Sequence, residues 1–266
     1  MIEKKPQIRP PKDSFKKEET SWGNVAPWYD QSVESGGSYQ RELILPNLMR
    51  LLNLKQGEKV LDLACGQGLF AREIKNAGAE VVGSDISSEL IALAKERSKG
   101  AGIEYFVSPA ESQNNLADES FDKVVCVMAL QDMEDLTSVM KEVGRILKKN
   151  GTFYAVINHP TFRIPKRSSW GYDDKNNIQY RRVDEYMSES RVKIDVHPGG
   201  KSGEATSYFH RPLQSYFKAF EKAGLAVARM EEWVSGRVSE PGPRALAENK
   251  SRKEFPLFMA LAVRKL

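Results

Sequence analysis

Short apolar runs alternate with segments of helical periodicity through the middle of the chain. The apolar runs predict buried strands at 59–65, 80–85, 103–107, 121–129 and 152–158. Between them, residues 69–77, 87–99 and 134–148 have the spacing of helices, and Ser87 is a suitable N-cap for the second. Strands that alternate with helices indicate a mostly parallel sheet covered by helices on both faces.

The alternation changes towards the C-terminus. A predicted helix at 212–223 ends before Gly224, and two strands follow at 225–234 and 257–265 with a long loop between them and no helix. Because no crossover helix separates these two strands, we expect them to pair antiparallel. Upstream of the first strand, apolar residues at helical spacing predict a further helix over 39–54.

Two segments fall outside this pattern. Residues 1–20 combine lysines, glutamates and prolines with few apolar positions, a composition that predicts a mobile basic tail. Residues 159–211 are rich in aromatic residues, and the runs RRVDEYM and RVKIDV are typical of short strands. Such a long segment is not a structureless loop in a compact domain, so we expect an inserted substrate cap over the carboxyl ends of the strands. Residues 21–158 and 212–266 are predicted to form the main domain.

The composition narrows the class of protein. Of the 266 residues, 40% are hydrophobic and 29% charged, which is typical of a globular protein. No apolar run approaches the roughly 18 residues that a membrane span needs. Without a recognisable secretory signal, Cys65 and Cys126 are expected to be reduced thiols in a cytoplasmic protein. The scattered histidines and the lack of a carboxylate cluster predict no metal site.

The turn after the first strand fits two cofactors. Its sequence, VLDLACGQGLFA, contains Gly66-x-Gly68-x-x-Ala71, and Asp85 follows about 20 residues later, as in a dinucleotide-binding fingerprint. Asp62, four residues before Gly66, distinguishes the two interpretations. A carboxylate beside the turn repels a pyrophosphate, whereas it attracts the ammonium and sulfonium groups of S-adenosylmethionine.

The run Asp62-x-Ala64-Cys65-Gly66-x-Gly68 resembles motif I of the class I S-adenosylmethionine-dependent methyltransferases, and the similarity extends through most of residues 40–158. The resemblance implies a Rossmann-like sheet of seven strands in the order 3-2-1-4-5-7-6, with strand 7 antiparallel. It also implies S-adenosyl-L-methionine as the cofactor. The implied contacts come from the glycine turn, the ends of strands 2 to 4 and an aromatic residue near the N-terminus: Asp62, Ala64, Gly66, Gly68, Asp85, Ile86, Ala110, Glu111, Met128, Ala129 and Tyr29.

Some of these assignments have structural alternatives. Asp85 is expected to accept hydrogen bonds from both ribose hydroxyls, although it could instead cap the helix that begins near Ser87. Glu111 could be a solvated loop charge, and Tyr29 could be a core aromatic residue.

The methyl acceptor is expected outside the carboxyl ends of strands 4 and 5. Asp132 and His159 follow those strands and are the candidate catalytic groups. An imidazole is suited to accepting a proton near neutrality, but we favour a structural turn at His159-Pro160. Within and after the cap, the candidate substrate contacts are His210, Arg211 and Trp170. Alternatively, Arg211 is a surface residue at the start of a helix, and the aromatic residues of the cap, which include Trp170, form the cap's own core.

These features predict a methyltransferase that acts on an oxygen or nitrogen nucleophile of a small molecule by in-line displacement. The sequence MALQDM after strand 4 lacks the Asn-Pro-Pro-Tyr type tetrapeptide of amino-group methylases, which lowers the expectation of nucleobase chemistry. A formal net charge of +4 allows an RNA methyltransferase as an alternative without indicating one. The other alternative is a non-catalytic module that binds S-adenosylmethionine.

Overall fold

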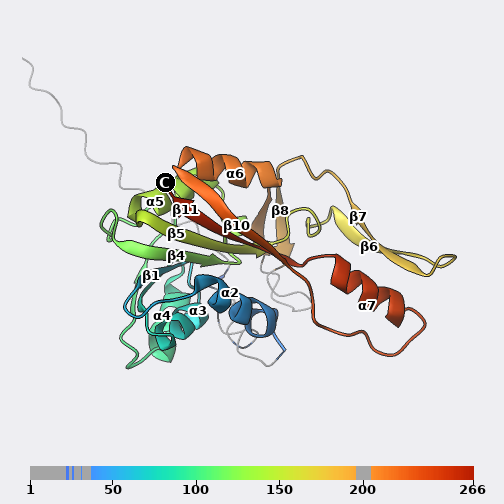
Figure 1. Ribbon diagram of the computed structural model, residues 1–266, viewed down its shortest axis with the longest axis horizontal. Coiled ribbons are helices and arrows are strands. Elements are labelled where there is room, and N and C mark those ends of the chain that lie inside the picture. Colours follow the sequence, from blue (N-terminus) through green and yellow to red (C-terminus); the bar gives the residue numbers. More distant parts are fainter. Residues whose placement is uncertain (1–21, 24–25, 27–30, 32–36, 196–204) are drawn as a thin grey trace, which may run out of the picture.

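The computed structural model describes residues 22–23, 26, 31, 37–195 and 205–266, which are built around a seven-stranded sheet (Figure 1). The strands of this sheet are β1 (Lys59–Leu63), β2 (Glu80–Asp85), β3 (Glu104–Val107), β4 (Phe121–Val127), β5 (Leu147–Asn158), β10 (Leu225–Trp233) and β11 (Phe258–Lys265). Their spatial order is β10-β11-β5-β4-β1-β2-β3. Strand β11 runs antiparallel to both of its neighbours, and the other pairs are parallel. The predicted order 3-2-1-4-5-7-6 is therefore confirmed.

Helices cover both faces of the sheet, as the apolar pattern predicted. One face packs against η1 (Gln40–Ile44, a π-helical turn), α2 (Leu45–Leu52), α3 (Leu69–Asn76) and α4 (Ser88–Arg97). The other face packs against α5 (Leu136–Ile146) and α6 (Leu213–Lys222), and Figure 1 shows the two groups on opposite sides. In the part of the chain that is described, no helix combines the length and the apolar composition needed to cross a bilayer.

The prediction of a long loop without a helix between the last two strands is wrong, because this segment contains helix α7 (Ala245–Glu254). This helix buries few of its side chains, among them Ala247 and Ser251, so its sequence has almost no apolar periodicity to reveal it. Ser251 donates a hydrogen bond to the Gln179 carbonyl of the inserted segment (2.8 Å), which anchors the helix. The antiparallel pairing of β10 with β11 holds despite the intervening helix.

The inserted segment forms two separate hairpins. Strands β6 (Ser168–Asp173) and β7 (Ile178–Val183) make the first, which projects from the body beside α7 in Figure 1. Strands β8 (Ser190–Asp195) and β9 (Ala205–His210) make the second. Strand β9 contacts the short 3-10 helix η2 (Leu130–Asp132), which follows β4 at the carboxyl end of the sheet.

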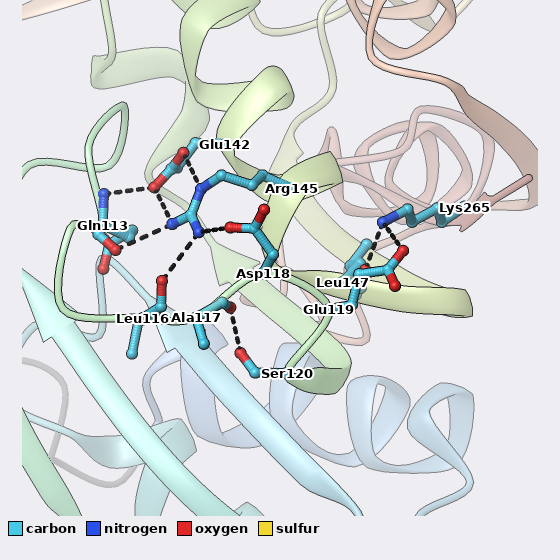
Figure 2. Close-up of polar contacts among 10 residues, drawn as sticks. All are labelled: Gln113, Leu116, Ala117, Asp118, Glu119, Ser120, Glu142, Arg145, Leu147 and Lys265. Atoms are coloured by element: carbon cyan, nitrogen blue, oxygen red, sulfur yellow. Dashed lines mark hydrogen bonds and ion pairs between the residues drawn. The ribbon is translucent and has the colours of Figure 1, made fainter.

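The opposite end of the sheet is fastened by a polar cluster (Figure 2). Arg145 of α5 donates hydrogen bonds to the carbonyls of Leu116 (2.9 Å) and Gln113 (3.1 Å) in the loop that leads into β4. Its guanidinium also pairs with the Glu142 carboxylate (2.7 Å), which accepts a further bond from the Gln113 backbone N–H (2.7 Å). These contacts satisfy two backbone carbonyls and one backbone N–H of a loop that has little regular secondary structure.

Candidate functional site

A cavity of about 270 Å³ lies at the carboxyl ends of β1, β2, β4 and β5 and is bordered by the β8–β9 hairpin. Its size is near the lower end of the range for ligand pockets, roughly 300–1,000 Å³. Seven of the residues predicted from the sequence line it: Ala64, Gly66, Asp85, Ile86, Met128, Ala129 and Asp132. A wider trough of about 490 Å³ runs between α6 and the edge strand β10, but none of the predicted site residues lines it.

The turn that follows β1 forms part of the cavity wall and has a left-handed backbone. Ala64, Gly66 and Gly68 all have positive φ values, of 58°, 54° and 83°. This left-handed backbone is costly for Ala64 and free of strain for the glycines. Hydrogen bonds fix the turn, from the Cys65 N–H to the Ser84 carbonyl (2.9 Å) and from the Gly66 N–H to an Asp85 carboxylate oxygen (2.9 Å).

Asp85 combines a structural role with a place in the cavity. Its Oδ2 accepts the bond from Gly66, and its Oδ1 accepts one from the Ser87 N–H (2.9 Å). Burial raises the pKa of Asp85, and these backbone donors oppose that shift. The cap of α4 is the Ser87 hydroxyl, which accepts from the Leu90 N–H (3.1 Å). Since each carboxylate oxygen can accept two hydrogen bonds, Asp85 retains acceptor capacity for a ligand in the cavity it lines.

Asp62 is buried beneath the turn without a partner for one of its oxygens. The residue is 1% exposed, and its Oδ2 has no hydrogen-bond partner among the described residues. It borders a small cavity of about 30 Å³ that shares Ala64 and Gly66 with the larger one. Burial raises the pKa of Asp62 to about 7, and the nearby charge of Asp85 adds to this effect. An orphaned carboxylate oxygen of this kind fits a cationic ligand group.

The charges around both cavities agree with that conclusion. Their lining side chains include the carboxylates of Asp62, Asp85 and Asp132 and, among the described residues, no lysine, arginine or histidine. A pyrophosphate would be repelled in this environment, whereas an ammonium or a sulfonium would be attracted. The residues present therefore fit S-adenosylmethionine rather than a dinucleotide.

Three of the other predicted donor contacts lie outside the cavity. Gly68 packs against the neighbouring helix and strand instead, because a Cβ there would lie 2.6 Å from the Tyr105 hydroxyl. Ala110 and Glu111 follow β3 but are not among the lining residues, and the side chain of Glu111 is exposed. Tyr29 lies outside the described residues.

Asp132 lies in the cavity wall at the end of η2, beyond β4. Burial raises the pKa of Asp132 to about 8. The neighbouring Gln131 donates a hydrogen bond to the Met128 carbonyl. Its own Oε1 is buried, and so is Oδ1 of Asn158, a lining residue at the end of β5; neither oxygen has a partner in the part of the chain that the structure describes. This side of the cavity is therefore rich in hydrogen-bond acceptors.

His159 does not line the cavity, and its contacts are those of a structural residue rather than of a catalytic base. The ring is 3% exposed, and its Nε2 lies 2.7 Å from a carboxylate oxygen of Glu232. Its Nδ1 accepts the Thr161 N–H (3.2 Å), so Nε2 carries the proton and donates it to Glu232. Burial lowers the pKa of His159, and Glu232 opposes that shift. With both nitrogens engaged, His159 forms the structural turn that the sequence favoured.

The three predicted substrate contacts also lie elsewhere. His210 is buried, with its Nε2 2.8 Å from the Tyr186 carbonyl. Arg211 donates to the carbonyls of Met133 (2.7 Å) and Glu134 (2.6 Å) and so ties the end of β9 to the loop after β4. Trp170 stands on the projecting hairpin, against the ring of Phe255 (centroids 5.4 Å apart) and the guanidinium of Arg181. None of the three lines the cavity.

Sequence reasoning missed several residues that do line the cavity. They come from the N-terminal region, from the end of β5 and from the β8–β9 hairpin: Trp22, Gln40, Asn158, Ile194, Thr206 and Tyr208. Asn158 could have been found, because it ends the fifth strand at the edge where ligands bind in such sheets. Thr206 and Tyr208 lie two positions apart and so share one face of β9. Only the folded hairpin shows that this face of the strand meets the cavity.

Comparison with known proteins gives a consistent result. Residues 61–155 match the methyltransferase domain family. A 135-residue segment is 31% identical to a ubiquinone biosynthesis O-methyltransferase from Aliivibrio fischeri and covers 49% of this chain and 58% of that relative. The chain thus matches little more than half the length of such curated relatives.

The fold is shared with solved structures over a larger part of the chain. An S-adenosylmethionine-dependent methyltransferase from Mesorhizobium loti superposes with a TM-score of 0.67 at 26% identity, covering 82% of this chain and 96% of that one. One from Methanosarcina mazei superposes with a TM-score of 0.54 at 21% identity, covering 82% and 97%. Strand order, glycine turn and acidic cavity agree with these similarities: residues 61–155 match the methyltransferase domain family, and the chain shares its fold with S-adenosylmethionine-dependent methyltransferases of known structure.

Proposed function

We propose that this chain transfers the methyl group of S-adenosylmethionine to an oxygen nucleophile of a small-molecule acceptor, with Asp132 as the group that accepts the proton. The observation that carries the proposal is the placement of Asp132 and Asp85 in one cavity, at the ends of different strands. In this proposal Asp85, at the end of β2, binds the donor's ribose, and Asp132, beyond the end of β4, faces the acceptor. The name of the Aliivibrio fischeri relative, an O-methyltransferase, supports the choice of nucleophile.

Residues of the β1–β2 side hold the donor in this proposal. The Asp85 carboxylate binds the ribose hydroxyls, and the orphaned oxygen of Asp62 attracts the donor's cationic end, with Gly66 allowing close approach of the backbone. Met128 and Ala129 line the wall between the two sides. When bound, S-adenosylmethionine supplies an electrophilic methyl group on a sulfonium.

Asp132 acts on the other side of the cavity. Displacement at a methyl group depends mainly on alignment and on exclusion of water, and a base helps where the nucleophile must lose a proton. Because burial raises the pKa of Asp132 to about 8, its carboxylate is a stronger base than an exposed aspartate. The buried hydroxyl of Tyr208 and the amide of Asn158 border the same space and orient the acceptor.

The cavity favours a small acceptor over RNA. The β8–β9 hairpin covers it with Ile194, Thr206 and Tyr208, and its described lining carries carboxylates without a basic side chain. Phosphate groups of a nucleic acid would be disfavoured beside these carboxylates. A module that only binds the donor would have no use for a basic carboxylate on the acceptor side.

Methyl-labelled S-adenosylmethionine, incubated with separate small-molecule, RNA and protein fractions of a cell extract, tests the proposal. We expect label in the small-molecule fraction, and Asp132→Asn should reduce its incorporation about 10²–10⁴-fold while donor affinity changes by less than about twofold. In the wild type, incorporation should rise with pH through about 8, as Asp132 ionises, and the variant should lack this rise. Label in RNA alone, or donor binding without transfer to any fraction, would contradict the proposal.

The same variant has a stability signature. A carboxyl group whose folded-state pKa is raised binds its proton more tightly in the folded state, so folding becomes less favourable as pH rises from about 4 towards 8. Asp132→Asn removes this dependence. Its thermal midpoint should therefore exceed that of the wild type by a margin that widens over the same range, which separates a lost base from a damaged fold.

A further inference from the structure

Arg163 is a partly buried cation without a counter-charge among the described residues. Its backbone N–H donates to the His159 carbonyl (2.9 Å), in the turn that follows β5. Its guanidinium lies over the ring of Phe258, with Cζ 5.5 Å from the centroid. Neither an ion pair nor a side-chain hydrogen bond joins the guanidinium to any described residue. Burial lowers the pKa of Arg163, and the two groups that oppose this are the hydroxyls of Tyr208 and Tyr39, not a carboxylate.

Three other arginines that are partly or fully buried hydrogen-bond to described residues, although Nη1 of Arg211 is left without a partner among them. Arg145 holds two carbonyls and the Glu142 carboxylate, and Arg211 holds two carbonyls. Arg181, next to Arg163, donates to the Phe162 carbonyl (2.8 Å) and to the Ser168 hydroxyl (2.7 Å). The guanidinium of Arg163 is only partly withdrawn from solvent, and no described residue uses its donors, so they are available to the acceptors of a ligand.

The neighbours of Arg163 place it at the acceptor end of the cavity. Phe258, beneath the guanidinium, pairs with Asn158 in the sheet, and Asn158 lines the cavity. Tyr208 lines the cavity itself. Tyr39 packs edge-on against Phe258 (centroids 5.8 Å apart) and directly precedes the lining residue Gln40. Arg163 is not itself a lining residue; its guanidinium lies over Phe258, whose strand partner Asn158 lines the cavity.

Tyr208 links this cation to Asp132. Burial raises the pKa of Tyr208, the charges of Tyr216 and Asp132 add to the shift, and the charge of Arg163 opposes it. The Tyr208 hydroxyl is thus within electrostatic reach of both the carboxylate and the guanidinium. An acceptor that extends from Asp132 past Tyr208 would bring its far end to Arg163.

We propose that Arg163 binds a carboxylate of the methyl acceptor, so that the acceptor is a hydroxylated carboxylic acid whose hydroxyl group faces Asp132. The proposal rests on the methyl transfer proposed above. The planar guanidinium can donate two parallel hydrogen bonds to a carboxylate, which fixes orientation as well as position. The donor's own carboxylate is a less suitable partner. Its cationic end is assigned to Asp62 below the β1 turn, and strand β4 separates β1 from β5, which Arg163 follows.

The test uses pairs of probes that differ only in charge: the three hydroxybenzoates and the three corresponding hydroxybenzamides. Their affinities for the full chain are measured by calorimetry, with and without S-adenosylhomocysteine. At least one hydroxybenzoate should bind about tenfold or more tightly than its amide, and Arg163→Gln should reduce this preference to twofold or less. Arg163→Lys, which keeps the charge but loses the two-pronged donor, should give an intermediate preference and serves as the variant of choice if the glutamine variant does not fold.

The affinity for S-adenosylhomocysteine separates the two proposals. Unchanged donor-product affinity in Arg163→Gln, together with the lost preference for the acid, supports an acceptor site. A loss of that affinity would reassign Arg163 to the donor, and equal binding of acid and amide by the wild type would overturn the carboxylate site. A wild type that prefers the acid but does not bind S-adenosylhomocysteine would leave the Arg163 site standing and remove the proposed methyl transfer.

Discussion

The half of the cavity that faces β1 and β2 is formed largely by backbone, whereas the half that faces β4, β5 and β9 is formed by side chains. On the first half, a left-handed turn and the backbone donors of Gly66 and Ser87 fix the Asp85 carboxylate. On the second half, Asp132, Asn158 and Tyr208 come from three elements far apart in the sequence. The half proposed to hold the donor depends on local backbone geometry that few substitutions can preserve, whereas the half proposed to hold the acceptor can change its specificity one side chain at a time.

The largest effect is expected on the donor half. Asp85→Ala should weaken the affinity for S-adenosylmethionine about 100-fold or more, because two charge-assisted hydrogen bonds to the ribose are lost and the Gly66 and Ser87 N–H groups lose their acceptor. Calorimetry with the ligand measures this. Glu111→Ala is the matched control, since this carboxylate is exposed and does not line the cavity, and its affinity should remain at the wild-type value. An unchanged affinity in Asp85→Ala would refute the ribose assignment.

A second effect, on stability and not on binding, is expected where the turn meets the core. Gly68→Ala should lower the free energy of unfolding by about 2–4 kcal/mol, because the new Cβ would meet the Tyr105 hydroxyl at 2.6 Å and φ is +83°. Denaturant unfolding measures the change. Gly100→Ala separates the two causes, since its φ is +82° but nothing lies within 4 Å of the added Cβ. Equal losses in the two variants would show that packing against Tyr105 plays no part.

The smallest effect is expected at His159, behind the acceptor half. His159→Gln keeps a donor for Glu232 and should cost about 1 kcal/mol of stability, with turnover and donor affinity within about twofold of the wild type. Because burial lowers its folded-state pKa, His159 makes the wild type less stable as pH falls below about 6.5, and the variant should lack this loss. A tenfold fall in turnover at an unchanged thermal midpoint would restore His159 as a base.

The parts of the molecule that sequence predicted well are those with local signals. The strands of the main sheet, the glycine turn and the Ser87 cap each depend on residues a few positions apart. Asp62 could be read as a carboxylate beside the turn because it lies four residues before Gly66. Its orphaned oxygen then supported the inference about charge.

The parts that sequence did not predict depend on contacts between distant segments. Helix α7 shows little amphipathic pattern, since it contacts the rest of the chain through few residues. His210 and Arg211 were expected over the pocket, but their hydrogen bonds to Tyr186 and to the loop after β4 turn them away from it. Which of two polar residues faces a cavity is decided by register and packing, and neither is visible before the chain folds.

The position of β11 has a consequence for how the protein is made. Strand β11 lies between β5 and β10, and its pairing of Phe258 with Asn158 joins residues 100 positions apart. Until residues 258–265 leave the ribosome, β5 and β10 each lack a neighbour and expose unpaired hydrogen-bonding edges and apolar side chains. While the preceding residues are being synthesised, the sheet thus lacks the strand between β5 and β10. The exposed edges of β5 and β10 are then open to incorrect pairing.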